Sequence, residues 1–253
     1  MSEIWRFLLT GQMDASSNMA MDEAVLRLNS GKEVGTLRFY SWEPKAISIG
    51  YFQGINEEVN VARCRKYGVD VVRRITGGGA VYHDDELTYS LIVNENNPKI
   101  PKNILESYGT ICKGIILGLD KLGIPSEFKP INDIISGGKK ISGNAQTRQL
   151  GNVLQHGTIL QDVDVKTMFQ LLLVPDEKIR DKMISAVEER VTSIRHILGR
   201  KIEPDKILQA MKAGFSEALD VELVRGEPTV EEWALMKKIR EEKYDADAWN
   251  FKR

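Results

Sequence analysis

The sequence predicts an α+β domain, with sheet strands in the first two-thirds of the chain and helices that pack around them and dominate the end. Two observations lead to this class. Segments rich in β-branched and aromatic residues alternate with glycines through the first part, which is typical of strands. From residue 164 onward, apolar residues recur at helical spacing with short breaks. We expect one main domain, because no repeat, low-complexity tract or linker-like run divides the 253 residues.

The first predicted helix lies near the N-terminus. Ser17 or Asn18 can cap it, because short polar side chains accept hydrogen bonds from the first free N–H groups of a helix. Its apolar positions 21, 24, 25 and 28 share one face, and Gly31 is expected to end it. Five extended segments are predicted to follow, at residues 37–42, 46–52, 69–75, 80–83 and 86–94.

A second helix and a second β region come next. Residues 104–122 carry a continuous apolar face that includes Cys112, which favours a core position for this thiol. Residues 139–147 and 153–161 read as strands. The segment Gln149-Leu150-Gly151-Asn152 between them predicts a hairpin turn.

The remaining helices show clear start signals. Pro204 suits a first helical position, where its missing N–H costs nothing. Thr229 followed three residues later by Glu232 is a capping-box pattern. Residues 231–244 alternate charges around a few apolar side chains, which predicts a solvated amphipathic helix.

Composition excludes several classes of protein. Lys plus Arg number 35 against 36 Asp plus Glu, a net charge of −1 that argues against a general nucleic-acid binder. Two cysteines build no disulfide framework, and their spacing has no metal signature. The apolar run at residues 7–9 is too short for a signal peptide, and no segment approaches the ~20 apolar residues of a membrane span. We expect a cytoplasmic protein that binds neither nucleic acid nor membrane.

The segment Arg73–Asp84, with the sequence RRITGGGAVYHD, is the strongest chemical motif. Glycines allow positive φ and let the backbone lie directly against a ligand. Exposed N–H groups in such a turn form an anion-binding concavity, and the two arginines add positive charge. The motif therefore predicts a phosphate or carboxylate site. It matches neither the Rossmann nor the Walker pattern. The alternative is an ordinary glycine-rich hairpin with a basic edge.

A second group of motifs follows: Asn132-Asp133, then GGKKISGNA at residues 137–145, then Gln155-His156-Gly157-Thr158. A lysine flanked by glycines on a strand can approach a ligand closely and supply a compact positive charge. Alternation along the strand places Lys139 and Lys140 on opposite faces, so at most one points into a given pocket. The alternative is that both lysines are solvated on an exposed hairpin.

Taken together and in this order, the motifs resemble the lipoate–protein ligase family, which is grouped with biotin ligases and octanoyltransferases. The similarity runs from Trp5 to Asn250. It implies a biotin/lipoate-ligase-like catalytic domain over residues 1–253, built on a mixed, largely antiparallel sheet packed with helices. Many such ligases continue into a small accessory domain. Here that domain is expected to be absent, which leaves open whether a separate subunit supplies its function.

The resemblance implies a two-step reaction. Lipoate and ATP, with Mg²⁺, give lipoyl-AMP, and a lysine of an acceptor lipoyl-domain protein then attacks the adenylate. Lys140 matches the family's catalytic lysine, which contacts both the acyl carbonyl and the phosphate. The implied ATP and adenylate contacts are Arg74, Gly79, Ala80, Val81, Tyr82 and Lys140. The implied lipoate contacts are Gly77, Gly78, His83, Lys140, Gly143, Ala145 and His156. Asp133 is the candidate Mg²⁺ ligand.

Two alternatives remain. The first is an octanoyltransferase, which moves an octanoyl group from acyl carrier protein onto the same kind of acceptor lysine. A ligase is favoured over it for two reasons: residues 124–136 hold no cysteine to form a thioester, and Gly79 stands where those transferases tend to carry arginine. Cys64 is a weak candidate thiol whose pKa neighbouring cations would lower. The second alternative is a non-enzymatic binder of small molecules.

Overall fold

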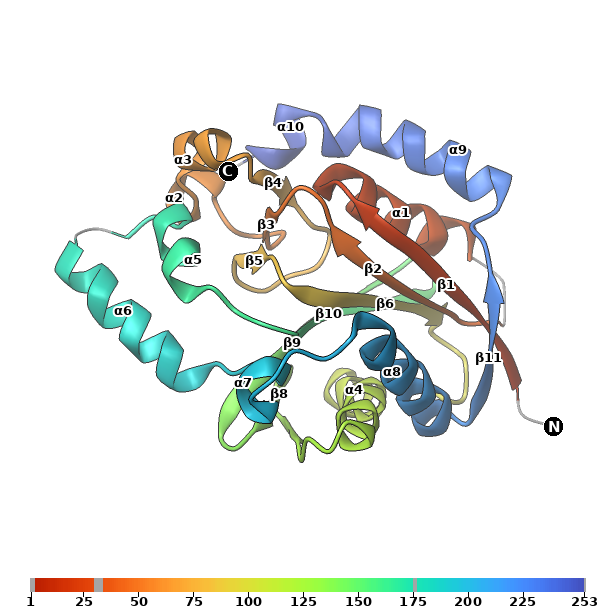
Figure 1. Cartoon of the computed structure of the whole chain (residues 1–253). Helices are drawn as coiled ribbons and strands as arrows, with labels where there is room; N and C mark the ends of the chain where they lie inside the picture. Colours follow the sequence, from red (N-terminus) through yellow and green to blue (C-terminus); the bar gives the residue numbers. More distant parts are fainter. Residues whose placement is uncertain (1–2, 30–33, 175–176, 253) are drawn as a thin grey trace.

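An eight-stranded sheet runs through the centre of the computed structural model, which describes residues 3–29, 34–174 and 177–252 (Figure 1). Its strand order is β11-β1-β2-β6-β10-β9-β8-β7. β1 pairs in parallel with both β11 and β2, and every other pairing in this sheet is antiparallel. The predicted α+β class with a mixed, largely antiparallel sheet is confirmed. The strands are β1 (Glu3–Met13), β2 (Thr36–Trp42), β6 (Glu86–Asn94), β7 (Glu127–Lys129), β8 (Asp133–Ser136), β9 (Lys139–Gln149), β10 (Asn152–Leu160) and β11 (Val221–Gly226).

A second, three-stranded sheet carries the arginine–glycine motif. Its order is β4-β3-β5, formed by β3 (Ala46–Ile49), β4 (Asp70–Arg73) and β5 (Val81–His83). The glycine loop connects β4 to β5. Three short helices pack against this sheet around a small core: α2 (Ile55–Glu58), α3 (Val61–Tyr67) and α5 (Val165–Leu171).

Helices cover both faces of the large sheet. On one face α4 (Ile104–Lys121) and α8 (Pro204–Leu219) pack side by side, and on the other lie α1 (Ala15–Leu28) and α9 (Val230–Ile239) (Figure 1). A π-helical turn, η1 (Arg240–Tyr244), and α10 (Asp247–Asn250) follow α9. The remaining helices are α6 (Glu177–Arg190) and α7 (Ile194–Leu198).

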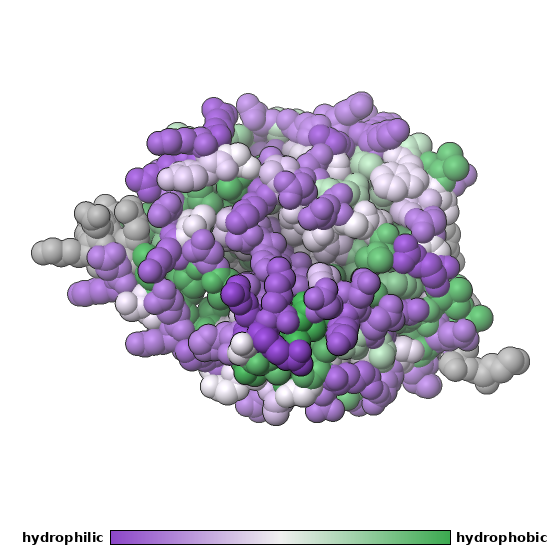
Figure 2. Space-filling model, in the orientation of Figure 1, coloured by the Kyte–Doolittle hydropathy of each residue, from purple (hydrophilic) through white to green (hydrophobic). Residues whose placement is uncertain are grey.

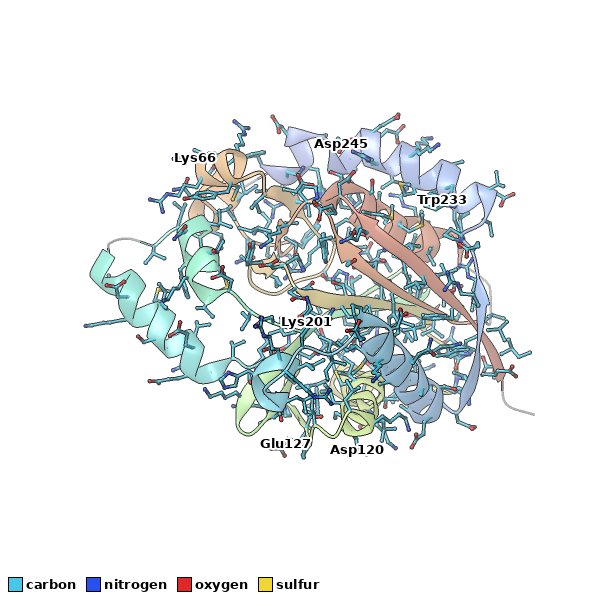
Figure 3. All side chains as sticks on the ribbon, in the orientation of Figure 1. Lys66, Asp120, Glu127, Lys201, Trp233 and Asp245 are labelled. Carbon is cyan, nitrogen blue, oxygen red and sulfur yellow. The ribbon has the colours of Figure 1, made fainter. Side chains whose placement is uncertain are left out.

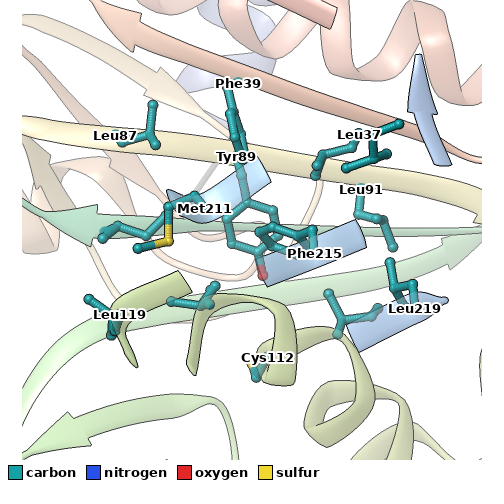
Figure 4. Packing of buried hydrophobic residues seen from close by; sticks show 14 of the residues in the cluster. Leu37, Phe39, Leu87, Tyr89, Leu91, Cys112, Leu119, Met211, Phe215 and Leu219 are labelled. Carbon is teal, nitrogen blue, oxygen red and sulfur yellow. The ribbon is translucent and has the colours of Figure 1, made fainter. Parts of the chain in front are cut away.

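The larger core lies between the sheet and the α4–α8 pair. Phe39, Tyr89 and Phe215 meet there with Met211 and Cys112, all buried (Figure 4). Glycine lets the two helices approach, because a Cβ at Gly214 would lie 2.3 Å from the carbonyl oxygen of Gly114. A second core fills the opposite face, between the sheet and α1, α9 and η1.

The helix start signals agree with the structure, apart from one. Pro204 opens α8, and Thr229 with Glu232 forms the predicted capping box of α9. The first helix begins three to four residues earlier than predicted, because Asp14 rather than Ser17 or Asn18 caps it. Its predicted end at Gly31 lies outside the described residues.

The strand predictions were incomplete at the sheet edges. β6 and the β9–β10 hairpin were predicted, with Leu150 and Gly151 at positive φ in the turn. β1, β7, β8 and β11 were not. β11 falls in a region predicted to be helical, and its pattern is only six residues long between two helices. Its partner β1 lies at the opposite end of the sequence, so no local signal marks the pairing.

The face seen in Figure 2 is mostly hydrophilic, with hydrophobic residues in small separate groups. Charged side chains such as Lys66, Asp120 and Asp245 lie at the outer rim (Figure 3). None of the helices in the described residues is long and apolar enough to cross a membrane.

Candidate active site

The two chemical motifs meet around one cleft. One wall is formed by the small sheet and its glycine loop, and the other by β9, β10 and the segment before β8. The cleft is lined by Met19, Tyr40, Trp42, Ser48, Arg74, Gly78, Gly79, Ala80, Val81, His83, Thr88, Asn132, Lys140, Gly143, Asn144, Ala145, His156, Gly157 and Thr158. Segments about 60 residues apart in sequence are thus brought together, as the motif order predicts.

Arg74 holds the glycine loop in shape. Its guanidinium donates to the carbonyl oxygens of Gly77 and Gly79 at 2.8 and 2.7 Å, and to that of Ser48 at 2.9 Å. Gly78 is the glycine of this loop at positive φ, and a Cβ there would lie 2.9 Å from the guanidinium. Burial lowers the pKa of Arg74 to about 10, and within the described residues it forms no ion pair. This buried cation therefore gives the loop wall a positive character.

The neighbouring arginine has a different position from the one predicted. Arg73 does not add charge to the cleft. It donates to the carbonyl oxygens of Gly50, Trp249 and Asn250 at 3.1, 3.0 and 2.9 Å. Alternation along β4 explains the difference, because consecutive side chains point to opposite faces of a strand. Arg73 therefore ties α10 to the small sheet.

Lys140 extends into the cleft from the opposite wall. Its ammonium group lies 2.7 Å from Asp133 Oδ1, and both side chains are roughly one-third exposed. A Cβ on Gly143 would lie 2.7 Å from Lys140 Nζ, so the glycine leaves the space that the ammonium occupies. Lys139 instead points away and donates to the backbone carbonyl of Glu188. The predicted separation of the two lysines agrees with this geometry.

His83 lies in a short chain of buried polar groups beside the loop. Its Nε2 is 2.7 Å from Ser48 Oγ, and its Nδ1 is 2.7 Å from Glu86 Oε1. The imidazole stacks on Trp42 with ring centroids 3.9 Å apart. Thr88 also donates to Glu86 Oε1, at 2.7 Å. Both His83 and Ser48 line the cleft.

His156 belongs to a second buried network. Its Nε2 is 2.6 Å from Thr76 Oγ1 of the glycine loop, and its Nδ1 is 3.3 Å from Asp22 Oδ2. Asp22 in turn forms an ion pair with Arg38 at 2.7 Å. Burial lowers the pKa of His156 below its ordinary value and outweighs the opposing effect of Asp22. Burial raises the pKa of Asp22, but Arg38, His156 and Ser90 outweigh it and leave that pKa below its ordinary value. The neutral imidazole thus joins the glycine loop to α1.

Most predicted site residues line the cleft. Those that do are Arg74, Gly78, Gly79, Ala80, Val81, His83, Lys140, Gly143, Ala145 and His156. Gly77 and Tyr82 do not. Tyr82 packs in the small core, because alternation along β5 turns Val81 and His83 to the cleft and Tyr82 away from it. Asp133 does not line the cleft either, but its carboxylate forms an ion pair with Lys140, which does.

The sequence interpretation missed several cleft residues. Met19, Tyr40 and Trp42 contribute apolar surface, and Ser48 contributes a hydroxyl group. None stands in a motif with glycines or paired charges. The available signal was the alternation in β3, where Ile47 and Ile49 face the small core and Ser48 faces the other side.

Neither cysteine lines the cleft. Burial raises the pKa of Cys64 to about 11, so the suggestion that neighbouring cations lower it is wrong. The basic side chains around Cys64 point to solvent from α3, while the thiol is buried in the small core. Burial also raises the pKa of Cys112 to about 12, and its core position confirms the prediction from the apolar face.

The predicted Mg²⁺ site does not fit the side chains present. Asp133 is paired with an ammonium group, which competes with a cation for the carboxylate. In the described part of the chain, no group of three or more His, Cys, Asp or Glu side chains is placed to hold a metal. We therefore derive no step through a metal at Asp133.

The fold therefore places a glycine loop and a lysine-bearing hairpin around one cleft. The family model described as "Lipoyl protein ligase A/B catalytic domain" matches residues 14–216. The chain belongs to this family.

Three relatives give the comparison more detail. Octanoyltransferase LipM from Brevibacillus brevis is 38% identical over 99% of this chain and 100% of its own length. Octanoyltransferase LipM from Bacillus subtilis is 37% identical over 99% of each chain. The solved bi-partite lipoate protein ligase from Thermoplasma acidophilum superposes with a TM-score of 0.91 and 31% identity, covering 98% of this chain and 96% of that one.

These relatives correct the predicted activity. Curated relatives at 36–39% identity over nearly the whole chain are octanoyltransferases, which contradicts an ATP-dependent lipoate–protein ligase and favours the alternative. The absence of a cysteine from residues 124–136 excludes one nucleophile and does not exclude the reaction. Family membership also argues against the non-enzymatic binder.

Proposed function

We propose that this protein transfers an octanoyl group from acyl carrier protein to a lysine of an acceptor lipoyl-domain protein, without ATP. The observation that carries the proposal is the near-full-length similarity to octanoyltransferases. The cleft supports it, because Met19, Tyr40 and Trp42 supply apolar surface for a hydrocarbon chain. Lys140 and Arg74 line the same cleft and supply positive charge for the reacting carbonyl group.

Lys140 is the proposed electrostatic catalyst. Attack on a thioester carbonyl places negative charge on its oxygen, and a positioned ammonium group stabilises that charge most in the transition state. Asp133 holds the ammonium group of Lys140 at 2.7 Å. Gly143 keeps the space open for the ammonium. The thiol of the carrier leaves, and the acceptor lysine gains the octanoyl group as an amide.

The glycine loop is the proposed rigid wall against which the carbonyl is positioned. Arg74 fixes three carbonyl groups around the loop and contributes a buried positive charge. His156 and Thr76 tie the loop to α1. A wall that does not reorganise lowers the cost of positioning the substrate, which is a large part of catalysis in acyl transfer.

Mass spectrometry of an acceptor lipoyl domain tests the proposal. One reaction contains the chain and octanoyl-[acyl carrier protein] without ATP, and the other contains the chain, octanoate or lipoate, and Mg-ATP. We expect a mass gain of one octanoyl group in the first reaction, and neither a mass gain nor pyrophosphate release in the second. A mass gain that requires ATP, or none from the carrier, would overturn the proposal.

A further inference from the structure

Consecutive hydrogen bonds join a hydroxyl group, an imidazole and a carboxylate at the cleft: those of Ser48, His83 and Glu86. Ser48 Oγ lies 2.7 Å from His83 Nε2, and Glu86 Oε1 lies 2.7 Å from His83 Nδ1. These are the distances at which a histidine accepts a proton from a hydroxyl group while a third group holds the ring. The three residues come from β3, β5 and the start of β6.

The donors and acceptors of these hydrogen bonds follow from the chemistry of the three side chains. A carboxylate only accepts, so His83 Nδ1 carries the hydrogen that bonds Glu86, and Nε2 of the neutral ring is left as an acceptor. Ser48 then donates its hydroxyl hydrogen to Nε2. The hydroxyl oxygen meanwhile accepts from Arg74 at 3.2 Å. A cation on that oxygen stabilises the alkoxide character that develops when the proton leaves.

The surroundings fit a charged histidine in the transition state. Glu86 is buried, and within the described residues its second oxygen, Oε2, has no hydrogen-bond partner. An imidazolium formed on His83 therefore lies beside an anion that water does not screen. Trp42, stacked on the ring at 3.9 Å, keeps the imidazole in one orientation. Trp42 itself donates to Thr88, which donates to Glu86.

From this geometry we propose that Ser48 is the acyl-accepting nucleophile of the reaction, with His83 as its general base and Glu86 as the positioning residue. The inference rests on the proposed function. It answers the lack of a reactive thiol, because both cysteines are buried away from the cleft. An oxygen ester on Ser48 replaces the thioester that a cysteine would form.

The two half-reactions balance. In the first, Ser48 Oγ forms a bond to the octanoyl carbonyl carbon, the C–S bond to the carrier breaks, and the hydroxyl proton passes through His83 to the leaving thiolate. In the second, the acceptor amine attacks the ester carbonyl and the C–O bond breaks. The amine proton passes through His83 back to Ser48, leaving an amide and the free hydroxyl.

The primary experiment looks for the ester itself. The full chain is incubated with octanoyl-[acyl carrier protein] without acceptor, and its intact mass and peptides are measured. We expect one octanoyl group on Ser48 that resists neutral hydroxylamine, as an oxygen ester does. In Ser48→Ala the adduct is lost and transfer falls by roughly 10³-fold or more, as with loss of a catalytic nucleophile. Ser107 is a buried serine on α4 outside the cleft, and Ser107→Ala serves as the matched control. This variant should retain the octanoyl adduct and the transfer rate.

Two further variants separate a catalytic role from a structural one. Ser48→Cys should restore an adduct that neutral hydroxylamine now cleaves, which a purely structural serine would not produce. Glu86→Gln should lower transfer by roughly 10²-fold or more and change its pH profile while leaving the Ser48 site present. Cys64→Ala and Cys112→Ala, each made alone, should retain the adduct.

The outcomes distinguish this inference from the proposed function. If the wild type transfers octanoyl groups and Ser48→Ala transfers equally well, the octanoyltransferase stands and the serine nucleophile is wrong. An octanoyl adduct on a residue other than Ser48 would likewise show that Ser48 is not the nucleophile. If the carrier thioester gives no transfer, the proposed function fails. In that case p-nitrophenyl octanoate still tests the nucleophile, because it requires no carrier: labelling of Ser48 supports it and its absence overturns it.

Discussion

The two walls of the cleft are built in opposite ways. The glycine-loop wall is buried and cross-linked, with Arg74 bonded to three backbone carbonyls and His156 joined to Thr76. The hairpin wall carries Lys140, which is partly exposed and held by one ion pair. Arg74, His156 and Thr76 of the first wall bond within the fold and set the shape of the loop, while the second wall presents an ammonium group that is partly exposed. Loss of a residue from each wall should therefore have a different signature.

After Ser48→Ala, the largest effect on transfer is expected on the hairpin wall. Lys140→Ala should lower octanoyl transfer by roughly 10²–10³-fold, as the loss of one oxyanion donor does, with little change in thermal stability. Initial rates from acceptor mass spectrometry and a thermal unfolding curve measure both. Lys139→Ala, one residue away on the opposite face, is the control and should transfer normally. A near-normal rate for Lys140→Ala would remove the distinction between the walls.

For Arg74 on the loop wall, the main loss should be stability. Arg74→Met leaves the carbonyl groups of Gly77, Gly79 and Ser48 without their donor, and we expect a loss of roughly 2–4 kcal/mol in the free energy of unfolding. Urea denaturation measures it. The exposed pair of Lys45 with Asp84, 2.8 Å apart, gives the contrast, because Lys45→Met should cost at most about 1 kcal/mol. Equal costs for the two variants would contradict the description of the loop wall as cross-linked.

Gly143→Ala tests whether octanoyl transfer depends on the exact position of the Lys140 ammonium group. The added Cβ meets the far end of the Lys140 side chain, which moves aside at little cost to stability. Displacing a catalytic group in this way should lower transfer by roughly ten- to hundredfold. Steady-state rates and an unfolding curve are compared with wild type. A large fall in stability with normal transfer would show that the glycine serves packing alone.

The smallest effect concerns pH. The pKa of His156 in the fold lies below its ordinary value of 6.5, so the fold disfavours the charged ring. Stability from this group is therefore complete above about pH 6.5 and is lost as pH falls through that value, by at most about 1.4 kcal/mol per unit. Denaturation at several pH values should show a weaker dependence in His156→Gln over the unit below pH 6.5. An unchanged slope would mean that the ring titrates equally in the unfolded chain.

Sequence patterns identified the parts of the site but not all of their contacts. The alternation of Lys139 and Lys140 and the positive φ at Gly78 follow from local backbone chemistry, and both agree with the structure. The orientation of Arg73 depends on α10, which lies far along the chain. Cys64 shows the same limit, because burial in the small core outweighs the charges beside it in sequence.

Ser48 was missed for a related reason. A serine between Ile47 and Ile49 gives no sign of function until β5 and β6 bring His83 and Glu86 beside it. The edge strands β1 and β11 are similar, since their parallel pairing joins residues 3–8 to residues 221–226. Local patterns predict elements well and contacts between distant elements poorly.

The bonds from Arg73 to Trp249 and Asn250 have a consequence for synthesis of the chain. Arg73 ends β4 and Arg74 follows it directly, so the docking site of α10 adjoins the residue that shapes the glycine loop. A ribosome has produced nearly every other element before residues 247–250 emerge to complete this clamp. A chain cut before residue 247 would lack these bonds to Arg73, at the end of the strand that leads into the glycine loop.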